Sequence, residues 1–109
     1  MNRRSLLVAS LFALAPRSTR AATCPRSSYC TVVSWFADSA ARGLYDDRAA
    51  TIARAQETIA KLDALPEQNC LSRIHRQMYA DLLRAAARDR HWDRNVALSW
   101  VRNQRRKYC

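Results

Sequence analysis

The chain has 109 residues, a formal net charge of +10, and only one glycine and three prolines. This length fits one domain, and so few turn-forming residues argue against a β-sandwich or a β-barrel, which needs many tight turns. Because the chain is rich in alanine, arginine and leucine, which favour helices, the composition predicts an all-α fold.

Residues 1–21 have the features of a cleaved signal peptide. Arg3 and Arg4 form a basic start, an apolar run extends over residues 6–15, and residues 19–21 offer a small-x-small cleavage site. The apolar run has half of the ~20 residues that a membrane-spanning helix needs, and Pro16 closes it. We therefore expect export to the bacterial periplasm, with secretion as the alternative, and no transmembrane segment in the mature chain. The paired arginines leave both the general secretory route and the twin-arginine route open.

Residues 22–109 are expected to form a single domain, a small antiparallel bundle of three or four helices. Apolar residues that recur at intervals of three and four predict four helices. The first extends over about residues 29–42, and the second begins at 46 or 47 and ends at 64. The third follows the link 66–69, and the fourth begins between residues 89 and 93. Ser27 and Ser28 are the predicted cap of the first helix, and Gly43 is its predicted terminator. Neither glycine nor proline separates the last two helices, so one bent helix is the alternative there. The predicted inward faces comprise Tyr29, Val32, Val33, Phe36 and Ala40; Ile52, Ala55, Ile59 and Leu62; Leu71, Ile74, Met78, Leu82 and Ala85; and Val96, Ala97, Trp100, Val101 and Tyr108.

Four cysteines in a short exported chain predict two disulfides. In an up-down-up-down bundle, the starts of the first and third helices and the end of the fourth share one end, so all four cysteines are expected to cluster there. We favour the pairs Cys30–Cys70 and Cys24–Cys109. The exchanged pairing, Cys24–Cys70 with Cys30–Cys109, comes second, and a local Cys24–Cys30 bridge comes third. No C-x-x-C motif is present, which argues against zinc and against covalent haem, so we expect neither a metal nor a cofactor.

The sequence offers little support for catalysis. It contains two histidines, His75 at the edge of an apolar stripe and His91 at a helix junction, and neither has a motif that would place a nucleophile beside it. Asp46 and Asp47 are adjacent carboxylates, but capping of the second helix accounts for them. No glycine-rich loop is present to bind a phosphate. We therefore expect no enzymatic activity.

Basic residues are concentrated in the C-terminal part of the chain. Residues 22–72 carry five basic and six acidic side chains, whereas residues 73–109 carry ten basic and three acidic ones. Most arginines of the last two helices point away from the apolar stripes, so two adjacent antiparallel helices would present one broad basic face. The predicted partner-binding arginines are Arg73, Arg76, Arg84, Arg88, Arg94, Arg102, Arg105 and Arg106. A solvated face without a partner is the alternative interpretation.

The expected partner of this face is an acidic protein, because arginine makes planar, bidentate contacts with carboxylates. An anionic envelope surface is the alternative, and export disfavours nucleic acid. Trp35 falls with Asp38 and Arg42 on the outward side of the first helix, which makes it a candidate interface anchor. A buried structural role for Trp35 is the competing interpretation.

These features favour a non-catalytic periplasmic binding protein, such as an inhibitor, an immunity protein or an accessory subunit of an envelope or secretion assembly. A membrane-active or toxin-like helical protein is the second hypothesis. A small hydrolase that uses His75 or His91 is the third.

Overall fold

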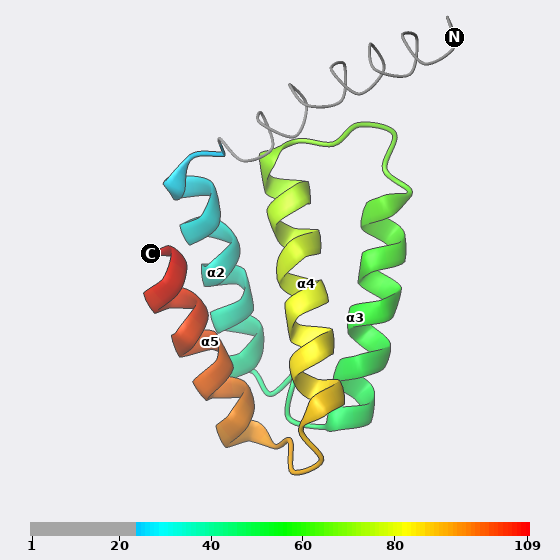
Figure 1. Ribbon diagram of the computed structural model, residues 1–109, viewed down its shortest axis with the longest axis vertical. Helices are drawn as coiled ribbons and strands as arrows, with labels where there is room; N and C mark the ends of the chain where they lie inside the picture. The colour runs from blue at the N-terminus through cyan, green and yellow to red at the C-terminus, as the bar shows by residue number, and fades with distance from the viewer. Residues whose placement is uncertain (1–23) are drawn as a thin grey trace, which may run out of the picture.

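The computed structural model describes residues 24–109, so the expected leader lies outside the described residues. Four α-helices make up this part of the chain (Figure 1): α2 Arg26–Ala41, α3 Arg48–Asp63, α4 Cys70–Arg88 and α5 Arg94–Tyr108. No strand occurs between residues 24 and 109, which confirms the all-α class. None of the helices in this range is long and apolar enough to cross a membrane.

The first helix starts earlier than the positions of Ser27 and Ser28 indicated. α2 begins at Arg26, directly after Pro25, and no side chain caps it. The prediction that Ser27 and Ser28 cap this helix is therefore wrong. Proline is well suited to a helix start because its fixed φ, here −66°, is compatible with entry into the first turn and its missing N–H costs no helical hydrogen bond. Both serines lie inside the first turn instead.

The other helix ends follow the sequence signals. Gly43 has φ 82°, the left-handed conformation that ends a helix with least strain at glycine. The side chains of Asp47 and Asp93 accept hydrogen bonds from the backbone N–H groups of Ala50 and Val96, so they cap α3 and α5. Asn69 forms a reciprocal capping box with Ser72 at the start of α4.

The last two predicted helices are separate. The backbone of Asp89 is extended, and its side chain accepts a hydrogen bond from the His91 backbone N–H at 2.9 Å, which makes a local turn. Trp92 is buried in this turn and donates its indole N–H to the Tyr45 carbonyl oxygen at 2.8 Å. The buried Trp92 therefore fixes the turn between α4 and α5, although this turn contains neither glycine nor proline.

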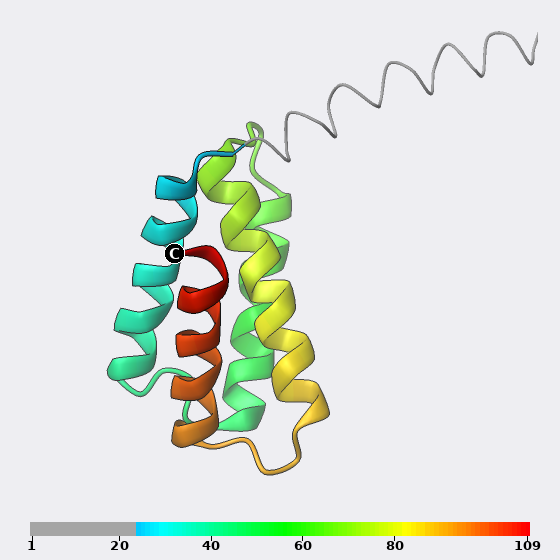
Figure 2. The ribbon, with the colours of Figure 1, turned by 60° about the vertical axis from the view of Figure 1, so that its left-hand side comes forward.

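The helices pack in the order α3, α4, α2, α5, which differs from their order in the chain. The main contacts join α3 with α4, α2 with α5, and α2 with α4. Figures 1 and 2 show that α2 and α4 run in the same direction, whereas α3 and α5 run the opposite way. The bundle is therefore two antiparallel pairs joined through the parallel contact of α2 with α4.

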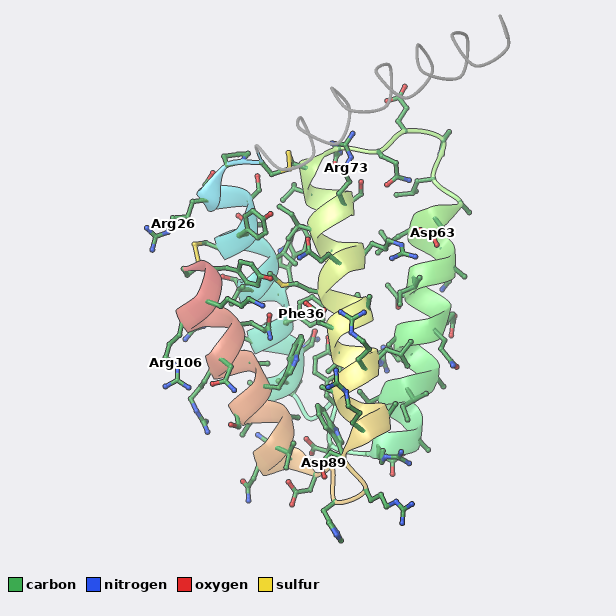
Figure 3. The ribbon with its side chains drawn as sticks, viewed as in Figure 1. Arg26, Phe36, Asp63, Arg73, Asp89 and Arg106 are labelled. Carbon is green, nitrogen blue, oxygen red and sulfur yellow. A yellow bond between two sulfur atoms is a disulfide. The ribbon has the colours of Figure 1, made fainter. Side chains whose placement is uncertain are left out.

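Phe36 occupies the centre of the core (Figure 3) and is 1 % exposed. Its ring lies 4.6 Å from that of Tyr79, 5.5 Å from that of Trp100 and 6.0 Å from that of Tyr45, measured between centroids. Aromatic pairs at such separations stabilise a fold beyond the area they bury. The buried apolar residues are Val32, Val33, Phe36, Ala40, Tyr45, Ala55, Ile74, Met78, Tyr79, Leu82, Ala86, Trp92, Ala97 and Val101. Most of the predicted inward faces are thus confirmed, while Leu71 is exposed.

Both disulfides lie at the end of the bundle where α2 and α4 begin and α5 finishes, but their pairing differs from the one we favoured. The structure joins Cys24 to Cys70 and Cys30 to Cys109, so the pairs Cys30–Cys70 and Cys24–Cys109 are wrong and the second-ranked pairing is correct. Cys24 precedes α2 and meets the first residue of α4 at the tip of the bundle. Cys30 lies one turn into α2, and the end of α5 reaches only to that level (Figure 1).

Candidate functional site

The eight predicted arginines are divided between α4 and α5, and the structure does not bring them into one face. The broad basic face required α4 and α5 to be closely packed neighbours, but the main partners of α4 are α3 and α2, and the main partner of α5 is α2. Arg73 lies at the start of α4, whereas Arg106 projects from the side of α5 that faces away from α4 (Figure 3). The predicted arginines therefore lie in several separate places rather than on one broad basic face.

Three of the four predicted arginines of α4 make contacts within the protein. The Arg76 guanidinium forms a two-point contact with Asp63 of α3, with Nε to Oδ1 at 2.7 Å and Nη2 to Oδ2 at 3.3 Å. This contact holds the pKa of the Asp63 carboxyl below its ordinary value. Arg84 pairs with Asp81 on its own helix, and Arg73 donates to the Gln68 carbonyl oxygen at 3.5 Å. These side chains are less available to an external partner.

Arg94 is the first residue of α5, and its side chain has a structural role. Its guanidinium donates to the Ala41 carbonyl oxygen at 3.1 Å and lies 3.4 Å from the Asp46 carboxylate. It therefore ties the start of α5 to the connection between α2 and α3. Asp46, one of the two adjacent carboxylates, is thus an ion-pair partner, and Asp47 is a helix cap.

The last turns of α5 carry three of the predicted arginines that form no ion pair within residues 24–109. Arg102, Arg105 and Arg106, which we call the α5 arginine strip, are exposed and line a shallow concavity of about 260 Å³. In the part of the chain that the structure describes, no aspartate or glutamate lies within ion-pair distance of these three side chains. Arg106 contacts the side-chain oxygen of Asn103, a neutral group. Cations are favourable at this end of a helix because its unpaired carbonyl groups carry partial negative charge.

The backbone beneath the α5 arginine strip is firmly held. The Cys30–Cys109 disulfide attaches the end of α5 to α2. The rings of Tyr29 and Tyr108 stack beside it with centroids 5.0 Å apart and an interplanar angle of 12°. The Arg26 guanidinium also donates to the carbonyl oxygen of Cys109. The strip is therefore presented on a helix whose end cannot easily fray.

Trp35 and Arg88 lie apart from the strip. Trp35 is 44 % exposed, which confirms its outward position, but its ring meets His75 of α4 at 5.4 Å rather than an arginine. Arg88 is exposed in the last turn of α4. His91, the second histidine, is exposed in the turn between α4 and α5.

Arg48 makes a structural contact between two helices that the sequence did not predict. Its Nε and Nη2 groups each donate at 2.8 Å, to the carbonyl oxygens of Ala86 and Ala87 respectively. An arginine in the first turn of one helix thereby satisfies the free carbonyls at the end of another. The position of Arg48 directly after a capping aspartate carries no signal of this contact, because the contact depends on how α3 packs against α4.

No known family model, curated protein sequence or solved structure matches this chain.

Proposed function

We propose that this protein is an exported, non-catalytic binding protein that recognises an acidic protein partner through the α5 arginine strip. The observation that carries the proposal is the set of three exposed guanidinium groups of Arg102, Arg105 and Arg106, which have no carboxylate partner among residues 24–109. The periplasm is the proposed location, and the two disulfides fit an oxidising compartment. An inhibitor, an immunity protein or an accessory subunit of an envelope assembly would work in this way.

The physical basis is the geometry of arginine on a rigid support. A guanidinium group can form two parallel hydrogen bonds with one carboxylate, which gives both strength and orientation. Because the end of α5 is held by a disulfide and a ring stack, binding requires little further ordering of the backbone. Charges on such an exposed strip also accelerate encounter with an acidic surface, and salt weakens this effect.

The test is a pull-down from envelope extracts with the purified mature protein as bait. We expect one stoichiometric acidic partner, and we expect its capture to be lost with the double variant Arg102→Glu/Arg105→Glu. The matched control is Arg54→Glu/Arg90→Glu, which makes the same change of net charge at two exposed arginines outside the strip. The control variant should capture the partner as the wild type does.

Two results would contradict this proposal. Equal loss of capture in both double variants would mean that only overall charge matters, as expected for a solvated basic surface. Leakage of vesicles that contain anionic lipid at micromolar protein concentration, without a captured protein, would favour the membrane-active alternative.

A further inference from the structure

A small pocket opens between α2, α4 and the connection that follows α2, away from the α5 arginine strip. Its volume is about 210 Å³, larger than the roughly 150 Å³ cavity that suffices to hold benzene in an engineered protein. The residues that line it are Trp35, Phe36, Ser39, Tyr45, His75 and Tyr79. Five of these six side chains carry an aromatic ring.

The rings are tilted relative to one another, so they enclose the space from several directions. The His75 ring lies 5.0 Å from Tyr79 at 48°, 5.4 Å from Trp35 at 63° and 5.8 Å from Phe36 at 83°. Phe36 and Tyr45 are almost completely buried, whereas Trp35 is exposed and His75 is half-buried. The pocket thus has a buried floor and an accessible mouth formed by Trp35 and His75.

Burial favours the uncharged forms of two polar groups of the pocket, Tyr45 and His75. Burial raises the pKa of Tyr45, and the adjacent hydroxyl of Tyr79, with the two oxygens 3.3 Å apart, raises it further. Burial lowers the pKa of His75, which favours its uncharged imidazole. None of the residues that line the pocket is an aspartate, glutamate, lysine or arginine. An anionic ligand would lose hydration here without gaining a cationic partner, and a cation would find only the attraction of the ring faces.

We propose that this pocket binds a small uncharged aromatic molecule that carries a hydroxyl or N–H group, such as a phenol or an indole. Trp35 and His75 offer ring faces and edges at the mouth, and Ser39 and Tyr79 add hydroxyl groups to the lining. A concave, mostly aromatic site with a few converging polar groups has the features of small-molecule sites in general. The proposal is independent of partner binding by the α5 arginine strip, because no residue is shared.

The experiment is an NMR titration of the mature, disulfide-bonded protein with p-cresol. We expect saturable one-to-one binding with a dissociation constant of about 1 mM or lower, and chemical-shift changes centred on the Trp35 indole, Ser39 and His75. Trp35→Ala should weaken binding about tenfold or more, since it removes one wall of the mouth. Tyr79→Phe keeps the ring and removes the hydroxyl, so it should weaken p-cresol binding several-fold and leave toluene binding unchanged.

The matched control is Leu65→Ala, because Leu65 is 42 % exposed, close to the exposure of Trp35, and does not line the pocket. This variant should bind p-cresol as the wild type does, and thermal melts should show that each variant is folded. The proposal is overturned if p-cresol does not saturate, or if Trp35→Ala binds it unchanged. It is also overturned if benzoate or phenyltrimethylammonium binds more tightly than p-cresol, since the pocket would then select a charge.

Discussion

The antiparallel pairs α2–α5 and α3–α4 have similar lengths but are held together by different chemistry. Between α2 and α5, a disulfide and the aromatic pairs Tyr29–Tyr108 and Phe36–Trp100 provide covalent and apolar contacts. α3 buries only Thr51 and Ala55 completely, and its ends are joined to α4 by Arg48 and by the ion pair of Asp63 with Arg76. Neither disulfide involves α3.

This difference separates the arginines that join helices from those that form no ion pair within residues 24–109. In the α3–α4 pair, the hydrogen bonds of Arg48 and Arg76 join α3 to α4. On α5, a disulfide and a ring stack attach the helix end, and Arg102 and Arg105 form no ion pair within residues 24–109. The comparison predicts that α3 is the first helix to detach and that α5 keeps its arginines in place.

Removal of the disulfides should have the largest effect on stability. The two bonds close segments with sequence separations of 46 and 79, so chain entropy predicts a loss of about 4 kcal/mol of unfolding free energy for each bond. Urea denaturation of Cys24→Ser/Cys70→Ser and Cys30→Ser/Cys109→Ser measures both losses. Only the second double variant should accelerate hydrogen exchange at the end of α5. Unchanged exchange there would contradict the idea that this bond secures the arginine strip.

Loss of the Arg48 contact should have the next largest effect. Arg48→Met keeps the aliphatic stem but removes two hydrogen bonds to the end of α4, and we expect a loss of about 1–2 kcal/mol in urea denaturation. Hydrogen exchange should accelerate in α3 and in the last turn of α4, while α5 is unaffected. Arg54→Met, at an exposed position on the same helix, is the control and should change stability little. Equal acceleration in α3 and α5 would mean that the two helix pairs do not differ.

Much of the fold follows from the sequence because its signals are local. The helix periods, Gly43 and the capping aspartates act within a few residues, and they predict the helices and the clustering of the cysteines at one end. The disulfide pairing could not be predicted, because it depends on an axial offset of one turn between α2 and the end of α5. The turn at Asp89 was uncertain because it is fixed by the burial of Trp92 against Tyr45.

The candidate sites were less predictable because they depend on which helices become neighbours. Outward positions for the arginines follow from helical periodicity, but the packing of α4 against α3 is what brings Asp63 to Arg76. The aromatic pocket was missed because its members come from two helices and one connection. Tyr45 offers the available signal, since a large aromatic residue between Gly43 and a capping aspartate suggests a connection that packs into the core.

Titration of His75 should change stability less than loss of the Arg48 contact does. Because burial lowers its pKa in the folded protein, the unfolded chain takes up the proton first as the pH falls below the ordinary value of 6.5. Unfolding free energy should therefore decrease between about pH 7 and pH 5, a range above the titration of most carboxyl groups. His75→Gln should flatten this part of the profile, and His91→Gln, at the exposed histidine, should preserve it. A flat profile in the wild type would argue against a buried neutral imidazole.

The smallest effect is expected for the ion pair that attaches the end of α3 to α4. The pKa of Asp63 is lowered mainly by its hydrogen bond with Arg76, so its stabilising contribution is present above the ordinary carboxyl range and is lost as the pH falls through the lowered value. Asp63→Asn should therefore be slightly less stable than the wild type at pH 7 and indistinguishable from it at about pH 2, in urea denaturation at both values.

Glu57→Gln is the matched control, because Glu57 is also exposed and paired, but with Lys61 on its own helix. Since only Asp63 bridges two helices, only Asp63→Asn should accelerate hydrogen exchange along α3 at pH 7. If Glu57→Gln accelerates exchange equally, the pair with Arg76 does not dock α3, and the polar attachment of this helix would rest on Arg48.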